Sequence, residues 1–247
     1  MEVCLREAER IDDLQFGLKI IQNHKKFCFG TDAVLLSHFA SIKRNDLVAD
    51  LGTGTGIIPI LLSAREEQSR LVGLELQADM VEMANRSIGL NNLHSRLEII
   101  EGDIKKAPEM LGPNSFNLVV SNPPYKKGGS GLVNPDDSLA IARHEIMCTL
   151  EDVIGAAAGL LVAGGRFAMV HRADRLADII CELRRTRLEP KRIKMVYPRI
   201  DRPPNLVLVE AIKYAKPYLK WQPPLIVYKE EGQYTEELLE IYNMTGQ

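Results

Sequence analysis

The 247-residue sequence has few cysteines and no long apolar run. Its four cysteines include no CxxC pair and accompany no histidine cluster, so we expect reduced thiols, with neither a zinc site nor a disulfide framework. No apolar stretch approaches the roughly 18 residues of a membrane-spanning helix, and the charged start "MEVCLREAERIDDL" does not resemble a signal peptide. These absences predict a cytoplasmic protein without a membrane partner and without a bound metal.

Charge is nearly balanced, with a formal net charge of −2, so the whole chain carries no nucleic-acid signature. Residues 184–220 are the exception, because they hold eleven lysines and arginines and only three acids. A segment of this kind can supply contacts to phosphates. The alternative is an ordinary solvated face, since an amphipathic helix at 174–186 exposes charges in any case.

From Asp46 onward, short apolar runs alternate with amphipathic segments. This rhythm predicts an α/β fold, a Rossmann-like doubly wound and mostly parallel sheet with helices on both faces. A helix is expected over 150–165 and a strand over 166–172. The last two long strands, at 192–199 and 205–213, follow each other without a helix between them. They predict an antiparallel strand at one edge of the sheet.

Residues 1–45 read as an N-terminal extension. The alternating stretch 14–30 predicts a hairpin with Asn23-His24 at its turn. A helix is expected to follow from Thr31, with Thr31 or Asp32 as its N-cap. We expect this extension to pack on a domain formed by residues 46–247, so that the chain is one compact unit and a monomer.

A glycine-rich turn, "DLGTGTG", joins the first strand of the alternating region to its helix. Gly52, Gly54 and Gly56 allow a ligand to approach the backbone, and the helix start offers free N–H groups. The spacing differs from the dinucleotide fingerprint G-x-G-x-x-G, and no Lys-Ser/Thr follows as in a P-loop. A tight turn that serves only packing is the alternative.

Two acids end the next two strands. Glu75 stands 23 residues after Gly52, where an acid commonly holds ribose hydroxyls, and Asp103 is placed to meet an adenine amino group. Either acid alone could be a surface residue. Their order beside the glycine turn favours a ligand at the carboxyl ends of the strands.

The stretch "SNPPYKKGG" follows the fourth strand. Pro123 and Pro124 fix the backbone and remove two donors. The Asn122 side-chain oxygen can accept from an NH₂ group, and Tyr125 offers a flat face for stacking a base. The corner therefore suits an amino group as its substrate, with Asn122, Pro123, Pro124 and Tyr125 as the candidate catalytic residues. A proline-rich turn that merely ends a strand is the alternative.

Together, "DLGTGTG", Glu75, "GD" and "NPPY" resemble the class I S-adenosylmethionine-dependent methyltransferases over about Asp46 to Lys213. The resemblance implies S-adenosylmethionine as cofactor and Asp50, Gly52 and Gly54 as cofactor-binding residues, with Glu75, Asp103 and Asn122. The signature [DNS]-P-P-[FYW] serves methylation of both adenine N6 and protein glutamine amides. A protein glutamine N5-methyltransferase acting on release factors therefore stays open.

The flanks "FGTDAVLLSHFA", "ARHE" and "PPLIVYKEEGQYTEELLEIY" resemble the bacterial tRNA(Val) adenine-N6 methyltransferase family. This implies tRNA as partner and the adenine just 3′ of the anticodon as substrate. It also implies Thr31 and Asp32 as cofactor neighbours.

Four residues are candidates for substrate binding: Lys126 and Lys127, whose charges flank the Asn-Pro-Pro-Tyr corner, and Arg143 and His144 in the "ARHE" stretch, where a structural role for a lone histidine is the alternative. Glutamine methyltransferases carry a helical N-terminal domain, whereas only 49 residues precede Asp50 here. A non-catalytic RNA-binding protein that keeps a cofactor fold is the third hypothesis, and the intact Asn-Pro-Pro-Tyr motif speaks against it.

Overall fold

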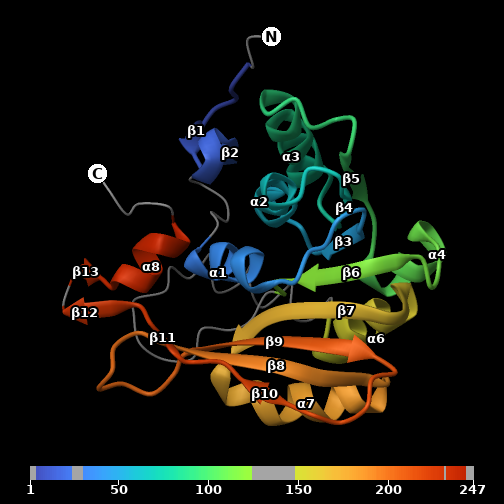
Figure 1. Cartoon of the computed structure of the whole chain (residues 1–247). Coiled ribbons are helices and arrows are strands. Elements are labelled where there is room, and N and C mark those ends of the chain that lie inside the picture. Colours follow the sequence, from blue (N-terminus) through green and yellow to red (C-terminus); the bar gives the residue numbers. More distant parts are fainter. Residues whose placement is uncertain (1–3, 24–29, 124–147, 231, 243–247) are drawn as a thin grey trace.

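The computed structural model describes residues 4–23, 30–123, 148–230 and 232–242 (Figure 1). Its main sheet has nine strands, β3 (Leu47–Leu51), β4 (Arg70–Glu75), β5 (Leu97–Glu101), β6 (Phe116–Ser121), β7 (Leu161–Arg172), β8 (Leu188–Tyr197), β9 (Leu206–Lys213), β10 (Lys220–Trp221) and β11 (Leu225–Ile226). Their order is β10-β8-β9-β7-β6-β3-β4-β5, and β11 also pairs with β8. The predicted mostly parallel α/β sheet is confirmed.

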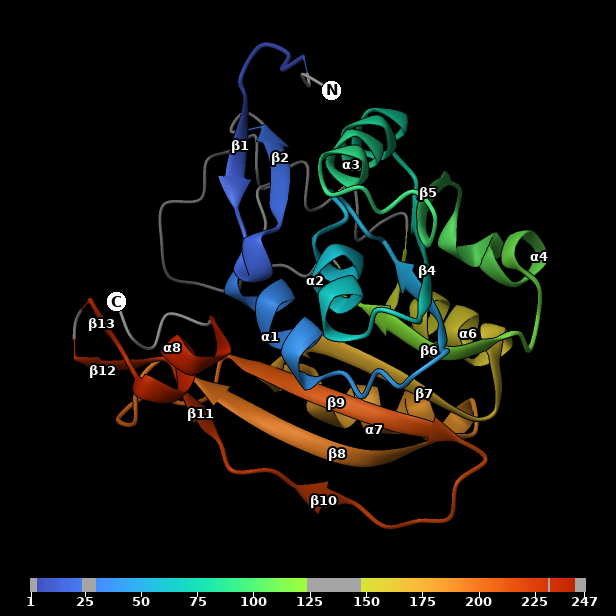
Figure 2. The same ribbon diagram turned by 45° about the horizontal axis from the view of Figure 1, so that its top comes forward.

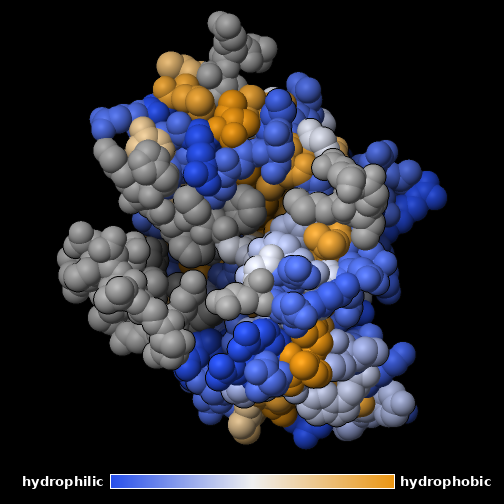
Figure 3. Space-filling view, turned by 90° about the vertical axis from the view of Figure 1, so that its left-hand side faces the viewer, coloured by the Kyte–Doolittle hydropathy of each residue, from blue (hydrophilic) through white to orange (hydrophobic). Residues whose placement is uncertain are grey.

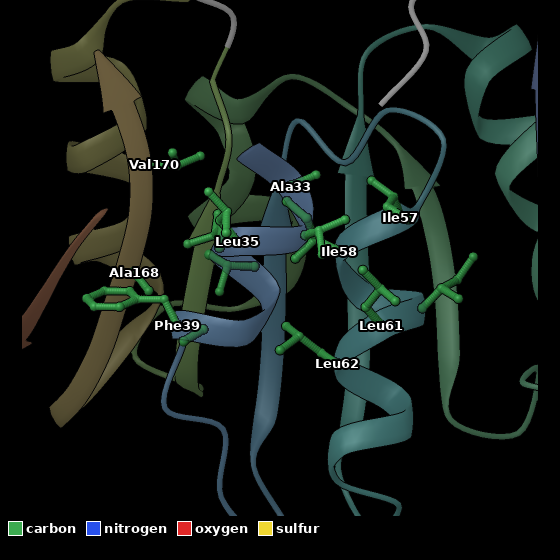
Figure 4. Close-up of a cluster of buried hydrophobic side chains, with 14 of the residues drawn as sticks. Ala33, Leu35, Phe39, Ile57, Ile58, Leu61, Leu62, Ala168 and Val170 are labelled. Carbon is green, nitrogen blue, oxygen red and sulfur yellow. The ribbon is translucent and has the colours of Figure 1, made fainter. Parts of the chain in front are cut away.

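Helices cover both faces of the sheet. They are α1 (Thr31–Phe39), α2 (Ile57–Arg65), α3 (Ala78–Leu90), α4 (Ala107–Leu111), α6 (Leu150–Leu160), α7 (Leu176–Arg185) and α8 (Glu236–Ile241). Figure 1 shows α1, α2 and α3 on one face and α6 and α7 on the other. Each face has its own apolar cluster, and Figure 4 shows the one in which side chains of α1 and α2 point toward each other and toward the strands.

The chain reverses its direction of sheet growth between β3 and β6. From β3 it adds β4 and β5 on one side, and it then returns to place β6 and β7 on the other. β3 is parallel to both β4 and β6, so the carboxyl ends of β3 and β6 lie next to each other. In open α/β sheets a ligand binds at such a switch point, outside the carboxyl ends of the strands.

The predicted antiparallel pair is confirmed, and the sheet order adds a detail. β9 runs against its neighbours and lies between β7 and β8, with β10 and β11 beyond β8. The helix expected over 150–165 ends at Leu160 instead, because Leu161 already pairs with Phe116 of β6 and begins β7. Pairing with a neighbouring strand therefore overrides the helical pattern of that stretch.

The N-terminal hairpin exists, but the prediction of its turn was wrong. β1 (Glu9–Asp13) pairs with β2 (Lys19–Asn23), and the turn lies at residues 14–18, so Asn23 ends a strand. Phe16 and Gly17 both adopt positive φ there, at 61° and 70°, and Gly17 reaches this conformation without steric cost. The residues of β1 are almost all charged or exposed, so the sequence there lacks the alternation of apolar and polar residues that predicts a strand.

The hairpin and the C-terminal helix lie on the same side of the sheet and touch, since the Gln15 side chain donates to the Ile241 carbonyl at 2.7 Å. Figure 2 shows β1 and β2 standing beside α3, where the Arg86 guanidinium pairs with Glu9 at 2.6 Å. The small β12 (Tyr228–Glu230) and β13 (Gln233–Tyr234) ribbon precedes α8, which packs against α1 and β11. Among the described helices none is long and apolar enough to cross a membrane.

Candidate active site

The glycine turn lies at the carboxyl end of β3, as the sequence predicts. The backbone N–H groups of Gly52 and Thr53 donate to the Leu74 carbonyl at 2.9 and 3.1 Å, which fastens the turn to β4. Gly54 has a φ of 57°, a conformation that L side chains rarely adopt. The turn therefore presents bare backbone at the start of α2.

Asp50 lies directly beneath this turn and is buried. Its Oδ2 accepts a hydrogen bond of 2.6 Å from the Thr53 hydroxyl. Its Oδ1 is buried and has no hydrogen-bond partner among the described residues. Burial raises the pKa of the Asp50 carboxyl to about 7; the Thr53 hydrogen bond opposes this shift, and the charge of Glu75 adds to it. An oxygen without a partner in such a place is suited to a polar or cationic ligand.

Glu75 ends β4 and is buried beside the turn. Its Oε2 accepts from the Gly54 N–H at 2.9 Å, and its Oε1 accepts from the Gln77 N–H at 3.0 Å. The carboxylate thus fixes the shape of the glycine turn. Leu76, the next residue, leaves 38% of its area exposed and adds apolar surface at this edge of the sheet.

Asp103 follows β5 and is half-buried. Its Oδ1 accepts from the Lys105 N–H at 2.9 Å, so it serves as N-cap of the short helix Ile104–Lys106. Asp50, Glu75 and Asp103 thus stand at the ends of three adjacent parallel strands, β3, β4 and β5.

Asn122 and Pro123 follow β6 directly, next to the end of β3. Ser121, the last residue of β6, is fully buried, and its hydroxyl donates to the Leu51 carbonyl at 2.8 Å. Leu51 immediately precedes Gly52, so this bond ties the corner that begins at Asn122 to the glycine turn. Ser121 and Thr53 were not predicted as site residues from the sequence, although they lie in the motifs "SNPPYKKGG" and "DLGTGTG".

Thr31 and Asp32 form the first turn of α1, but neither is its N-cap. Gly30 takes that position without a side-chain hydrogen bond, and the Asp32 Oδ1 accepts from the adjacent Ala33 N–H at 3.0 Å. The predicted cap was therefore wrong, because the helix includes both residues. The Thr31 side chain hydrogen-bonds with Tyr242. Ala33 lies beside Ile58 in Figure 4, which brings the first turns of α1 and α2 together.

The remaining predicted site residues lie outside the described residues: Pro124, Tyr125, Lys126, Lys127, Arg143 and His144. Figure 3 looks at the edge of the sheet to which β6 points. On this face the coloured surface is mostly hydrophilic, and apolar residues gather near the top, at the level of the β1–β2 hairpin. The described residues bring no three potential metal ligands together.

Comparison with known proteins identifies the family. The sequence model of the methyltransferase small domain matches residues 21–182. The chain belongs to this family. A tRNA1(Val) (adenine(37)-N6)-methyltransferase of Porphyromonas gingivalis is 33% identical over 86% of each chain. One from Haemophilus influenzae is 28% identical and covers 90% of this chain and 92% of its own.

Among solved structures, a protein described as a predicted O-methyltransferase from Agrobacterium tumefaciens matches this methyltransferase with a TM-score of 0.69. It is 28% identical and covers 86% of this chain and 96% of its own. The chain is thus an enzyme with the class I methyltransferase fold, and S-adenosylmethionine is its methyl donor. The bare glycine turn, the unpartnered Asp50 oxygen and Glu75 at the neighbouring strand end fit this cofactor.

Proposed function

We propose that this methyltransferase transfers a methyl group to the N6 amino group of an adenine in tRNA. The relatives' names give adenine 37 of tRNA1(Val), the position next to the anticodon, and we extend that substrate to this chain. The observation that carries the proposal is the position of Asn122-Pro123, held beside the glycine turn by the Ser121–Leu51 hydrogen bond. A cytoplasmic, monomeric protein is part of the same proposal.

The cofactor is assigned to the glycine turn and the acids around it. When bound, S-adenosylmethionine supplies an electrophilic methyl group on a sulfonium. We assign Glu75 to the ribose hydroxyls and Asp50 to the methionine part, which its unpartnered Oδ1 would contact. Gly52 and Gly54 line the cofactor with backbone, and Asp103 is placed for the adenine amino group. Thr31 and Asp32 approach from the first turn of α1.

Asn122 and Pro123 are assigned to the acceptor amino group. The adenine N6 is a poor nucleophile because its lone pair is delocalised into the ring. If its two hydrogens donate to the Asn122 side-chain oxygen and the Pro123 carbonyl, the nitrogen moves toward a tetrahedral shape and the lone pair becomes available. The N–C bond then forms as the C–S bond breaks, and the product nitrogen loses its proton to water. Positioning of this kind can be worth several kcal/mol.

Residues beyond Pro123 complete the proposal. Tyr125 would stack on the adenine, which has to leave its own stack to reach the site, and Pro124 would stiffen the corner. Lys126, Lys127, Arg143 and His144 are proposed as RNA contacts. Each is a candidate for alanine substitution once the substrate is established.

The substrate is tested by incubating the protein with methyl-labelled S-adenosylmethionine and either bulk tRNA or release factors. We expect label in tRNA, and mass spectrometry of the digested RNA should find it as N6-methyladenosine. Labelled glutamine without labelled adenosine would replace this proposal with protein methylation. Label in neither substrate would contradict both.

The role of Asn122 is tested by Asn122→Ala. We expect loss of methyl transfer by about a hundredfold or more, the scale seen when one preorganised polar group is removed from an active site. Cofactor affinity, measured by calorimetry, should stay nearly unchanged. Asn117→Ala is a poor control because the Asn117 side chain accepts a part-buried bond from the Leu47 N–H. Gln68→Ala serves instead, because the bond that its side chain accepts from Arg44 lies at the exposed surface. Loss of cofactor binding in the Asn122 variant would show that its role is structural.

A further inference from the structure

The lysines and arginines of the basic segment 184–220 fall into two groups, those held by a partner within the protein and those without an acidic partner. Six of its eleven cationic side chains form ion pairs, and the buried Lys213 donates to three neutral oxygens. Four form no ion pair among the described residues: Arg187, Lys191, Lys216 and Lys220, of which Lys191 donates one hydrogen bond to the Lys216 carbonyl at 3.0 Å. These four come from two stretches only, the start of β8 and the chain leading into β10.

Three large aromatic side chains stand on the second of these stretches, the chain that leads into β10. Tyr214, Tyr218 and Trp221 are 58%, 74% and 59% exposed. The Arg187 guanidinium lies 5.9 Å from the Tyr214 ring, and the Lys191 ammonium lies 5.7 Å from the Tyr218 ring. Trp221 pairs with Ile193 in the sheet, which places it along the same edge. We call the four cations and three aromatics the outer-edge cluster.

Protection of the sheet edge explains only part of this composition. Lysines and prolines beside an edge strand prevent other chains from pairing with it. Exposed tyrosines and a tryptophan act in the opposite direction, because uncovered aromatic surface favours association. Cations interleaved with aromatic rings are instead the composition of surfaces that bind RNA, through phosphate contacts and base or sugar stacking.

We infer that the outer-edge cluster binds the tRNA at a distance from the reacting adenine. The inference rests on the proposed function. In the sheet order, four strand spacings separate β10 from β6, the strand that Asn122 follows, which is about 19 Å at ~4.8 Å per spacing. A small molecule or a single nucleotide cannot reach from Asn122 to this edge, whereas a folded tRNA can.

The charge pattern favours RNA over a protein partner. Glu189 is the acid within the stretches that form the cluster, and its Oε1 is held by Arg184 at 2.9 Å. An edge with four available cations and no available acid would repel a second copy of itself. RNA fits both kinds of residue in the cluster, because its phosphates can bind the cations and its bases can stack on the aromatic rings.

Contacts far from the chemistry contribute equally to the bound substrate and to the transition state. Removing them should therefore raise KM for tRNA and leave kcat at saturating tRNA unchanged. Each lost phosphate contact should also reduce the salt dependence of binding by about one unit of slope.

Trp221 allows a direct test, because it is the only tryptophan in the chain. We expect titration with unmodified tRNA to change its fluorescence and the change to weaken with added salt. Equal quenching by poly-glutamate would overturn the inference, since the site would then recognise charge alone. A blue shift that grows with protein concentration in the absence of RNA, together with dimers in light scattering, would assign the edge to a second copy.

Matched variants complete the experiment. Lys216→Ala with Lys220→Ala should weaken tRNA binding about tenfold at low salt and reduce its salt slope. Tyr218→Ala should weaken binding with the slope unchanged, and filter binding measures both. Lys43→Ala with Arg70→Ala removes the same charge from exposed positions near β3 and β4 and should have little effect.

The inference and the proposed function fail in different ways. Wild-type protein that methylates tRNA while the edge variants bind and react normally would remove the inference and keep the function. Wild-type protein that labels no tRNA would remove the function, whatever the edge binds. Circular dichroism of each variant shows whether its fold is intact.

Discussion

Asp50 holds one carboxylate oxygen against Thr53 and keeps the other buried without a partner in the described structure. Removal from water disfavours the charged form of such a group. The consequence is a residue whose protonation changes near neutral pH. Its neighbour Glu75, by contrast, has both oxygens occupied by backbone N–H groups. The two acids at the glycine turn therefore contribute in different ways: Asp50 keeps one oxygen without a partner, whereas Glu75 holds the turn and can accept from a ligand only through the remaining lone pairs of its oxygens.

The raised pKa of Asp50 makes a prediction about stability. With a folded pKa of about 7, against about 3.9 in the unfolded chain, the folded state keeps a proton that the unfolded state loses. This contribution is complete below about pH 4 and disappears as pH rises through 7. Asp50→Asn should therefore be more stabilising, relative to the wild-type protein, at pH 8 than at pH 5, by at most about 3 kcal/mol in the cofactor-free protein. Urea unfolding of both proteins at the two pH values measures it, and an equal difference at both would contradict the buried acid.

At the scale of elements, the glycine turn depends on its packing against β4. Gly73 lies in the middle of β4, and a Cβ built there would stand 2.8 Å from the Thr53 side chain and 2.5 Å from Ile99. The absence of a side chain at Gly73 therefore gives Thr53 the room in which it hydrogen-bonds to Asp50. A glycine inside a strand often marks such a close approach.

Gly73→Ala should displace Thr53 and disturb the turn. We expect a loss of about 1–3 kcal/mol in unfolding free energy, as for other overpacked cores, and weaker binding of S-adenosylmethionine by calorimetry. Gly155→Ala is the control, since a Cβ there meets nothing within 4 Å and lies in α6. That change should stabilise the protein slightly. Unchanged cofactor affinity in the Gly73 variant would show that Thr53 is not needed in its place.

At the scale of the whole molecule, an ion pair between the buried Glu210 and the part-exposed Arg192 connects the N-terminal segment to the far side of the sheet through hydrogen bonds. The Glu210 carboxylate on β9 accepts from the Ser41 N–H at 2.9 Å and from Arg192 at 3.0 Å. The Arg192 guanidinium also donates to the Phe39 carbonyl at 2.7 Å and lies over the Phe39 ring. The bonds to Phe39 and Ser41 join residues 153 and 169 positions apart in the chain. We propose on this basis that residues 1–45 and the domain from 46 fold as one unit.

Glu210→Gln should leave Arg192 without its charge partner. We expect a loss of about 3 kcal/mol, the cost of breaking a buried pair from one side. Glu237→Gln breaks the more exposed pair with Lys194 and should cost less than about 1 kcal/mol. Unfolding followed by circular dichroism and by Trp221 fluorescence should give coincident transitions in all three proteins. A separate early transition in the wild-type protein would contradict a single unit.

The alternation of strands and helices, the glycine turn after β3 and the corner at Asn122 could all be predicted from the amino-acid sequence alone. These features are written in short-range patterns, because apolar period, glycine conformation and proline stiffness act within a few residues. For the same reason, the positions of Glu75 and Asp103 at strand ends could be predicted from the apolar runs that precede them. Pro124, Tyr125 and the four substrate candidates beyond them stay predictions.

Which residues far apart in the sequence come into contact could be learned only from the folded structure. It placed β9 between β7 and β8, joined Ser121 to Leu51, and left one oxygen of Asp50 without a partner. It also divided the basic segment into seven engaged cations and the four of the outer-edge cluster. Strand order, long-range hydrogen bonds and ion pairs depend on partners tens to hundreds of residues away, and no local pattern in the sequence encodes them.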